Sequence, residues 1–218
     1  MSTIAIVGGH GQIARRLIPL LASRNHTPLA LVRNPAQVAE LEELGARVRM
    51  LDIEADEADA FAQAFDGAHA VVFAAGGGPD GDVGRKKSVD LGGSLKSIDG
   101  AKQAGIHRFV QVSAVGVDDP IPDDTGAVWR AYVEAKRDAD AALRTSGLDW
   151  TIIRPGGLTD DPGTGKVALG SDVARGEVTR DDVAAVLAEV IDTGHGIGKQ
   201  WTLMGGDTEI KDAVAQAD

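Results

Sequence analysis

The sequence of 218 residues contains no cysteine, few aromatic residues and no long apolar run. The absence of cysteine excludes disulfides, thiolate nucleophiles and cysteine-ligated metal sites. A helix that crosses a bilayer needs roughly 20 consecutive apolar residues, and no stretch approaches that length. The amino-terminal residues MSTIAIVGG lack the basic region and the long apolar core of a signal peptide. We therefore expect a cytoplasmic protein without a membrane partner.

Basic residues are also scarce relative to acidic ones. The chain has 22 Lys and Arg against 33 Asp and Glu, which gives a formal net charge of −11. Such a chain repels the phosphate backbone of nucleic acids, so we do not expect a nucleic-acid partner. The five histidines share no spacing typical of metal ligands, and we expect no metal site. A small-molecule substrate is the expected partner.

Short apolar runs alternate with helical patterns along almost the whole sequence. Residues 3–8 form an apolar run that ends in glycine, and residues 12–24 carry apolar side chains at helical spacing. Strands that alternate with helices predict a parallel sheet with helices on both faces. We expect one α/β domain over residues 1–218, Rossmann-like and doubly wound, with a mostly parallel sheet. Its substrate loops and a small C-terminal extension would lie in residues 156–218.

The same patterns give the remaining elements. Further strands are predicted at residues 28–33, 47–51, 68–75, 107–113, 150–155, 166–169 and 200–205. Further helices are predicted at residues 56–65, 88–104, 128–145, 180–193 and 208–217. Loops rich in Gly, Pro and Asp are predicted at residues 76–81, 116–126 and 156–165.

The first candidate motif, GGHGQIA, follows the first predicted strand and opens the first predicted helix. Gly8 permits a tight turn, Gly11 lets the backbone approach a pyrophosphate, and Ala14 keeps the helix close to the sheet. The helix N-terminus presents free N–H groups and a partial positive charge to phosphates. In this context the motif favours dinucleotide binding over a merely structural turn. His10 fits an exposed loop position as well as a phosphate contact. The predicted contacts are Gly8, His10, Gly11, Gln12 and Ile13.

The second signal lies at the ends of the second and third predicted strands. NAD-selective sites usually place an acidic residue after the second strand, where it bonds the ribose 2′-hydroxyl. This sequence has Arg33 followed by Asn34, and an arginine there pairs instead with a 2′-phosphate. We therefore expect a preference for NADP(H), with NAD(H) as the alternative. Asp52 and Ile53 end the third strand, where Asp52 either lines the adenine pocket or caps the following helix.

The third signal is the pair Tyr132 and Lys136, four residues apart in a predicted helix. This spacing places both side chains on one helix face. A nearby ammonium lowers the pKa of a phenol and favours proton transfer near neutral pH. The hydroxyl of Ser113, at the end of the fifth predicted strand, is placed to hold a substrate carbonyl. The alternative interpretation is a half-buried tyrosine beside a solvated lysine.

Two other groups of residues have simpler interpretations. The tryptophans Trp129, Trp150 and Trp201 are expected in the core or at its edge rather than stacked on a substrate. Arg154, at the end of the sixth predicted strand, pairs either with an acidic loop or with a substrate.

Taken in order, the motifs resemble the short-chain dehydrogenase/reductase superfamily, specifically its atypical, epimerase-like NAD(P)H-binding branch. The resemblance covers nearly the whole chain. The matching segments are GGHGQIA, LVRNP, LDIE, VVFAAGGG, RKKSVDLGG, GIHRFVQVSAVG, YVEAKRDADAALRTSGLDWTIIRPGGLTDDPGTGKV and VTRDDVAAVL.

The resemblance implies a role for each matching residue. Ser113, Tyr132 and Lys136 would form the active site, in which Tyr132 donates a proton and Lys136 bonds the nicotinamide ribose. Arg85 would face this site without an assigned role. The remaining implied cofactor contacts are Ala74, Ala75 and Gly76 on the adenosine side and Pro155 and Gly156 beside the nicotinamide.

The resemblance is compatible with three functions. The first is an NADP(H)-dependent oxidoreductase that acts on a small carbonyl or alcohol. The second is a cofactor-binding regulator or redox sensor without turnover, since relatives in this branch often lose the tyrosine. The third is a nucleotide-sugar epimerase or dehydratase, but only 63 residues follow Pro155, too few for the large C-terminal domain of such enzymes. Because Tyr132 and Lys136 are retained, we expect the oxidoreductase. The resemblance also implies a homodimer.

Overall fold

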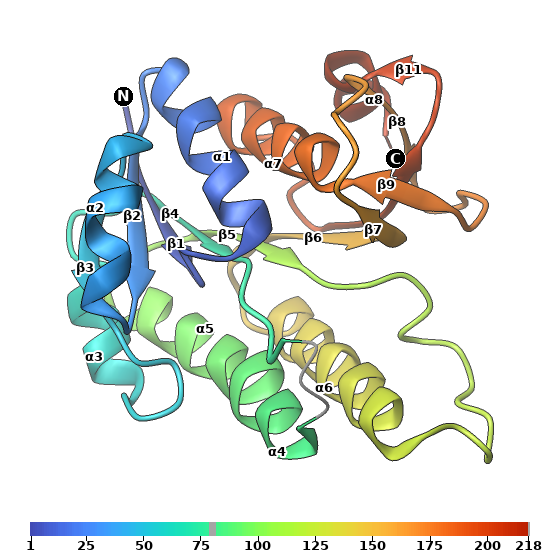
Figure 1. Cartoon of the computed structure of the whole chain (residues 1–218), viewed down its shortest axis with the longest axis horizontal. Helices are drawn as coiled ribbons and strands as arrows, with labels where there is room; N and C mark the ends of the chain where they lie inside the picture. The colour runs from blue at the N-terminus through green and yellow to red at the C-terminus, as the bar shows by residue number, and fades with distance from the viewer. Residues whose placement is uncertain (79–81, 218) are drawn as a thin grey trace.

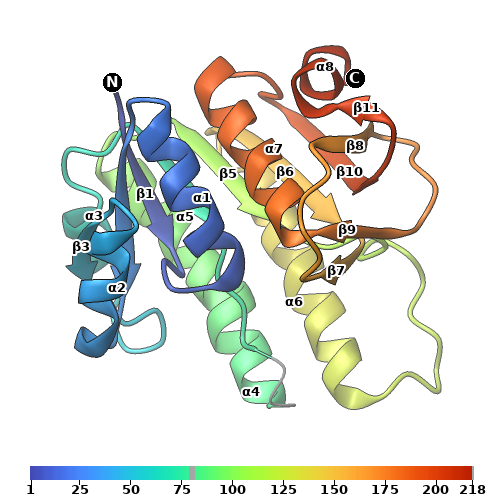
Figure 2. The ribbon, with the colours of Figure 1, turned by 45° about the horizontal axis from the view of Figure 1, so that its top comes forward.

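The computed structural model describes residues 1–78 and 82–217, and within them nine strands form one sheet (Figures 1 and 2). Residues 79–81 of the predicted loop 76–81 therefore lie outside the described residues. The sheet is mostly parallel and carries helices on both faces, which confirms the predicted doubly wound α/β architecture. The parallel strands, in order across the sheet, are β3 (Arg47–Met50), β2 (Thr27–Val32), β1 (Thr3–Val7), β4 (Ala70–Phe73), β5 (Arg108–Val112), β6 (Asp149–Pro155) and β10 (Lys199–Gly205).

The C-terminal portion lengthens this sheet at one edge. β8 (Lys166–Gly170) pairs antiparallel with β10, and β11 (Thr208–Glu209) pairs antiparallel with β8. A two-stranded sheet joins β7 (Gly157–Thr159) to β9 (Glu177–Thr179). The sequence pattern predicts neither β7 nor β9, because three residues are too few to show an alternating pattern.

Helices cover both faces of the main sheet. α1 (Gln12–Ser23) and α7 (Arg180–Thr193) pack together on one face, and α5 (Ser94–Gln103) and α6 (Ala127–Arg144) lie on the other (Figure 1). None of the helices in the described part of the chain is long and apolar enough to cross a membrane. The shorter helices are α2 (Val38–Glu43), α3 (Ala58–Ala64), α4 (Val83–Arg85) and α8 (Ile210–Gln216).

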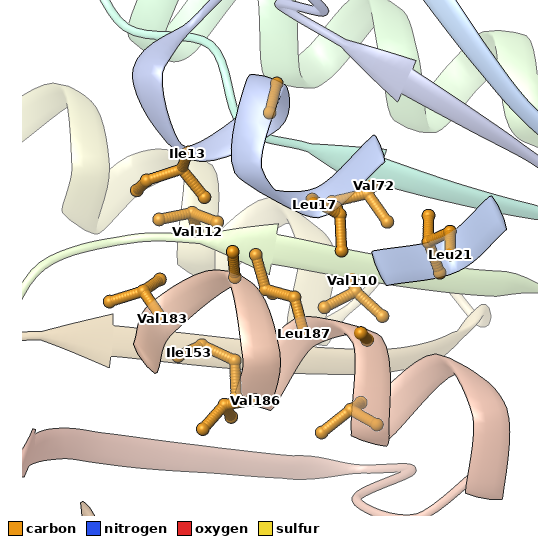
Figure 3. Close-up of a cluster of buried hydrophobic side chains, with 14 of the residues drawn as sticks. Ile13, Leu17, Leu21, Val72, Val110, Val112, Ile153, Val183, Val186 and Leu187 are labelled. Atoms are coloured by element: carbon orange, nitrogen blue, oxygen red, sulfur yellow. The ribbon is translucent and has the colours of Figure 1, made fainter. Parts of the chain in front are cut away.

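Each face of the sheet is sealed by its own apolar core. On one face, Val72, Val110 and Ile153 of three neighbouring strands pack under Leu17 of α1 and Leu187 of α7 (Figure 3). Since successive residues of a strand point to opposite faces, the alternate positions belong to the second core. Burial on both faces explains why these strands read as continuous apolar runs in the sequence. The second core includes Val71, Phe73, Phe109, Ile152 and Phe61.

The helical region after β4 starts earlier than the predicted helix 88–104. Asp82 caps the first turn of α4 through its side chain. The chain then continues through a π-helical segment, Lys86–Gly93, into α5. Wide π-helical turns are frequent at functional sites because they redirect side chains within a helix. Here the segment buries two charged residues, Lys86 and Asp90.

The strand order reverses beside β1, which lies between β2 and β4. Ligands of open α/β sheets bind outside the carboxyl ends of the strands at such a switch point. The chain places the glycine turn after β1, Arg33 after β2 and the segment 74–76 after β4 at this edge.

Candidate active site

The turn after β1 is built from glycines that larger residues cannot replace. Gly8 has a φ of +79°, and a Cβ there would lie 2.7 Å from the Cα of Ala75. Gly9, to which the sequence prediction gives no role, packs on β2, where a Cβ would lie 2.8 Å from the Cβ of Ala30. The turn therefore brings β1, β2 and the end of β4 into close contact.

The N-terminus of α1 opens into a cleft of about 430 Å³. Gly11 caps this helix without a side chain, and the first turn contains no acidic residue. The first N–H groups of a helix lack partners within it, so their partial positive charge is available to an anion such as a phosphate. The cleft is lined by Gly8, Gly9, His10, Gly11, Leu31, Val32, Arg33, Asn34, Gln37, Leu51, Asp52, Ile53, Glu54, Ala74, Ala75, Gly76, Arg85 and Val89.

Some predicted cofactor residues lie outside this cleft. The side chain of Ile13 belongs to the core, and Gln12 is the first residue of α1. Pro155 is buried at the end of β6. A Cβ on Gly156 would collide with Met204 of β10, so this glycine serves the packing of the C-terminal strands against β6. Lys136 also lies outside the cleft and is described below.

Two arginines meet at Glu54 in the wall of the cleft. Arg33 Nη1 donates a hydrogen bond to Glu54 Oε2 at 3.0 Å, and Arg85 Nε lies 3.7 Å from the same oxygen. Ser88 Oγ donates to the other carboxylate oxygen at 2.7 Å. A ribose 2′-phosphate at this place would meet two guanidinium groups, but it would compete with Glu54 for them.

Asp52 combines parts of both predicted roles. It lines the cleft, and its Oδ1 accepts hydrogen bonds from the backbone N–H groups of Glu54 at 2.9 Å and Ala55 at 3.4 Å. It therefore caps the turn after β3. It does not cap the next helix, because the N-cap of α3 is Glu57.

His10 lines the cleft and is also held by a neighbouring helix. Its Nε2 lies 2.8 Å from Glu40 Oε2, on α2, and Arg15 Nη1 donates to Glu40 Oε1 at 2.9 Å. The hydrogen bonds from Arg15 and His10 hold the pKa of the Glu40 carboxyl below its usual value. His10 is thus tethered at the cleft, and its contact with a phosphate stays a prediction.

The predicted pair Tyr132 and Lys136 lies on α6, one turn apart. Lys136 Nζ is 6.0 Å from the centre of the Tyr132 ring. It donates to the carbonyl of Val112 at 3.1 Å and lies 3.4 Å from Asp90 Oδ1. Lys136 is 5% exposed, so it is not the solvated lysine of the alternative interpretation.

The pKa of Tyr132 is raised, which corrects the sequence prediction. Burial of the hydroxyl raises this pKa above its ordinary value near 10.0, and Lys136 lowers it without offsetting burial. Asp90 and Asp140 raise it further. The lowering expected from one ammonium fails because burial of the hydroxyl outweighs the attraction of Lys136, and that ammonium also lies close to the buried carboxylate of Asp90. Tyr132 is therefore protonated at neutral pH.

Ser113 is not free to donate to a substrate in this arrangement. Its Oγ donates to Asp140 Oδ2 at 2.7 Å, and Arg154 Nη2 donates to the same oxygen at 2.7 Å. Gln111 Nε2 donates to Asp140 Oδ1 at 2.8 Å. Arg154 also donates to Asp118 in the loop after β5, at 2.7 Å, so it takes the acidic-loop alternative. The predicted contact between Ser113 and a carbonyl requires the hydroxyl to leave Asp140.

Asp90, on the π-helical segment, joins the cleft to the pair Tyr132 and Lys136. It is 1% exposed, and its Oδ2 accepts the N–H of Gly77 at 2.8 Å. Its Oδ1 faces Lys136 at 3.4 Å and would lie 3.2 Å from a Cβ on Gly76. One carboxylate therefore contacts both the loop after β4 and Lys136. Sequence reasoning singled out neither Asp90 nor Asp140, although Asp140 lies one helical turn after Lys136.

Comparison with known proteins decides the family. Residues 8–194 match the family described as NAD(P)H-binding. The chain belongs to this family. Two solved structures from Veillonella parvula described as short-chain dehydrogenases/reductases share its fold, each with a TM-score of 0.73 at 20% identity.

Three relatives illustrate the range of the family. The protein YhfK of Bacillus subtilis, named an uncharacterized sugar epimerase, is 37% identical over 212 residues, which are 97% of this chain and 98% of that protein. A Bacillus halodurans structure, provisionally assigned as an NAD-dependent epimerase/dehydratase, is 42% identical with a TM-score of 0.90, over 99% of this chain and 100% of that one. ChuY of Escherichia coli, an anaerobillin reductase, is 27% identical with a TM-score of 0.77, over 94% and 98%.

The cleft fits the dinucleotide of this NAD(P)H-binding family. The glycine turn leaves room that side chains would fill, and the uncompensated N-terminus of α1 suits a pyrophosphate. Arg33 and Arg85 would hold the adenosine ribose side, and Lys136 would hold the nicotinamide ribose. The described part of the chain brings together no group of three His, Asp or Glu residues that could hold a metal ion.

Proposed function

We propose that this protein is an NADP(H)-dependent reductase of a small carbonyl compound. The proposal rests on one arrangement, the placement of Tyr132 and Lys136 beside the loop that lines the cofactor cleft. Asp90 contacts that loop at Gly77 and faces Lys136 at 3.4 Å. The acid–base pair and the cofactor cleft are therefore parts of one site.

Tyr132 acts as the proton donor to the substrate oxygen. Its pKa lies above the ordinary value, so the hydroxyl is protonated at neutral pH, which is the form that the reduction of a carbonyl needs. The bound cofactor supplies the hydride that the substrate carbon receives. The ammonium groups of Lys86 and Lys136, each 6.0 Å from the Tyr132 ring centre, stabilise the phenolate that remains.

Arg33 and Arg85 support a preference for NADP(H) over NAD(H). Both guanidinium groups lie in the cleft, and both already bind a carboxylate of Glu54. A 2′-phosphate is an anion of the same kind and would use the same donors. NAD(H) is the second candidate, because Asp52 and Glu54 in the same wall can accept a hydrogen bond from a 2′-hydroxyl.

The name of one relative supports a reductase, and the names of two others support a different activity. ChuY is named a reductase, whereas YhfK and the Bacillus halodurans protein are named as epimerase-like. An epimerase returns its hydride to the substrate and must keep its oxidised cofactor bound. The small-molecule substrate, a homodimer and a cytoplasmic location remain parts of the proposal.

The test is cofactor consumption by the purified protein. We expect the protein to bind NADPH, to leave it unchanged alone, and to oxidise it when a panel of small aldehydes, ketones and quinones is added. Tightly bound NADPH that no carbonyl compound consumes would overturn the reductase and favour a regulator. NAD that co-purifies in stoichiometric amounts and does not exchange would favour the epimerase.

A further inference from the structure

Trp129 is the most exposed aromatic side chain near the proposed active site. It lies in the first turn of α6, and the residue is 59% exposed. Of the two predicted positions, core or edge, the core is therefore wrong for Trp129, whereas Trp201 lies in the core at 1% exposure. Single exposed apolar residues are common on protein surfaces, so exposure alone assigns no role.

The position of Trp129 relative to Tyr132 supplies the second observation. The two ring centres are 5.3 Å apart, and the ring planes are tilted by 33°. Both residues lie on one face of α6, with Lys136 one turn further along. Exposure falls along this face, from the open indole through the half-buried phenol to the buried ammonium. The face therefore leads from solvent to the proposed proton donor.

Lys86, on the π-helical segment, brings a second ammonium group close to the Tyr132 ring. Its ammonium donates to the carbonyl of Gly78 and lies 6.0 Å from the centre of the Tyr132 ring. Figure 2 shows α4 and the start of α6 at the same edge of the molecule, and these helices are in contact. Trp129 thus stands at the solvent end of a site whose inner end holds a phenol and two ammonium groups.

We propose that Trp129 is the stacking surface of the substrate site and that the substrate is a flat, conjugated carbonyl compound. This inference rests on the proposed reductase function. The phenol packs against the indole, and the indole residue is still 59% exposed, so a flat π-system has room to stack on it. Such a π-system gains from offset stacking beyond the area that it buries. A carbonyl group at the inner edge of such a molecule would point toward the Tyr132 hydroxyl. A compact aliphatic carbonyl would leave the indole in water.

The test is binding to the protein saturated with oxidised cofactor, because no turnover is then needed. Calorimetry compares a naphthoquinone with cyclohexanone on the wild type, Trp129→Ala and Trp129→Phe. Stacking worth about 0.5–1.5 kcal/mol corresponds to roughly a 2- to 13-fold change in Kd. We expect Trp129→Ala to weaken the naphthoquinone by that factor, Trp129→Phe to restore most of the loss, and cyclohexanone to bind equally to all three.

Three results of the binding test would each overturn the inference. In the first, the naphthoquinone binds equally to the wild type and to Trp129→Ala. In the second, Trp129→Ala loses the same affinity for the naphthoquinone and for cyclohexanone. In the third, Trp129→Ala changes the oligomeric state while naphthoquinone binding is unchanged. The last result would assign the indole to a contact between copies of the chain. Turnover without any dependence on Trp129 would remove only this inference. If the wild type shows no turnover but its binding of the naphthoquinone depends on Trp129, only the proposed reductase function is overturned.

Discussion

Ser113 Oγ lies 2.7 Å from Asp140 Oδ2, and the serine is the donor. An ionised carboxylate can only accept, so the serine proton is used inside the protein. Asp140 is fully buried, and it also receives hydrogen bonds from Arg154 and Gln111. Ser113, to which the sequence resemblance assigns a substrate contact, is therefore also one member of a buried network that includes Asp140, Arg154 and Gln111.

The network predicts that substitutions of its members lower the folding free energy by different amounts. Asp140→Ala leaves the nearly buried guanidinium of Arg154 with only Asp118, and we expect a loss of about 3–5 kcal/mol of folding free energy. Ser113→Ala removes one of several donors to Asp140 and should cost about 1 kcal/mol. Denaturant unfolding measures both. An equal cost, or a larger one for Ser113→Ala, would contradict the network as described.

The position of Glu54 predicts how the preference between NADPH and NADH changes when its single negative charge is removed. Glu54→Gln removes the carboxylate that competes for Arg33 and that repels a 2′-phosphate. Because Arg33 is about half exposed and the charges are screened, we expect NADPH to bind only about 2- to 5-fold more tightly. NADH should gain nothing. Titration of both cofactors measures the change, and Glu43→Gln, an exposed acidic residue outside the cleft, is the matched control. NADPH binding that is unchanged or weaker would contradict the role of Arg33.

The position of Asp90 predicts how the pH dependence of the reduction rate shifts when its charge is removed. Reduction needs a protonated Tyr132, so the rate should hold through neutral pH and fall as the pH rises through the raised pKa of that hydroxyl. Asp90→Asn removes an anion that raises this pKa, and the fall should move to lower pH. The exposed Asp99→Asn on α5 is the control. A fall that stays in place or moves to higher pH in Asp90→Asn would show that Asp90 does not act on Tyr132.

Gly8 and Gly67 form a matched pair for the glycine turn. Both have positive φ, at +79° and +76°, but a Cβ on Gly67 meets nothing within 4 Å. Gly67→Ala should cost about 1–2 kcal/mol from the left-handed backbone alone and leave cofactor binding intact. Gly8→Ala adds the collision with Ala75 and should lose cofactor binding as well. Unfolding and cofactor titration separate the two effects, and equal NADPH affinities in both variants would contradict the cleft assignment.

The sequence predicts the parallel sheet and the cofactor turn because both depend on local patterns. Doubly buried strands must be apolar throughout, and the turn after β1 needs glycine at Gly8. The short strands β7, β9 and β11 escape prediction, since their pairing partners and not their own residues define them. Spacing alone places Tyr132 and Lys136 on one helix face.

The charges around these two residues could not be predicted in the same way. Asp90, Asp140 and Arg154 come from three separate elements and meet only in the folded chain. The pKa of Tyr132 moves against the expected direction chiefly because burial desolvates its hydroxyl, and desolvation depends on everything that packs around a group. Asp90 and Asp140 add to this rise. The exposure of Trp129 is a tertiary property of the same kind.

The most direct test of the account is a single-turnover measurement on Tyr132→Phe. The wild type and the variant are loaded with NADPH and mixed with a carbonyl compound that the wild type reduces, and the loss of NADPH absorbance is followed. We expect NADPH affinities that agree within about 2-fold and a rate that falls by about 100-fold or more in the variant, because only the proton donor is removed. An unchanged rate in the variant would contradict the role of Tyr132 and, with it, the proposed mechanism.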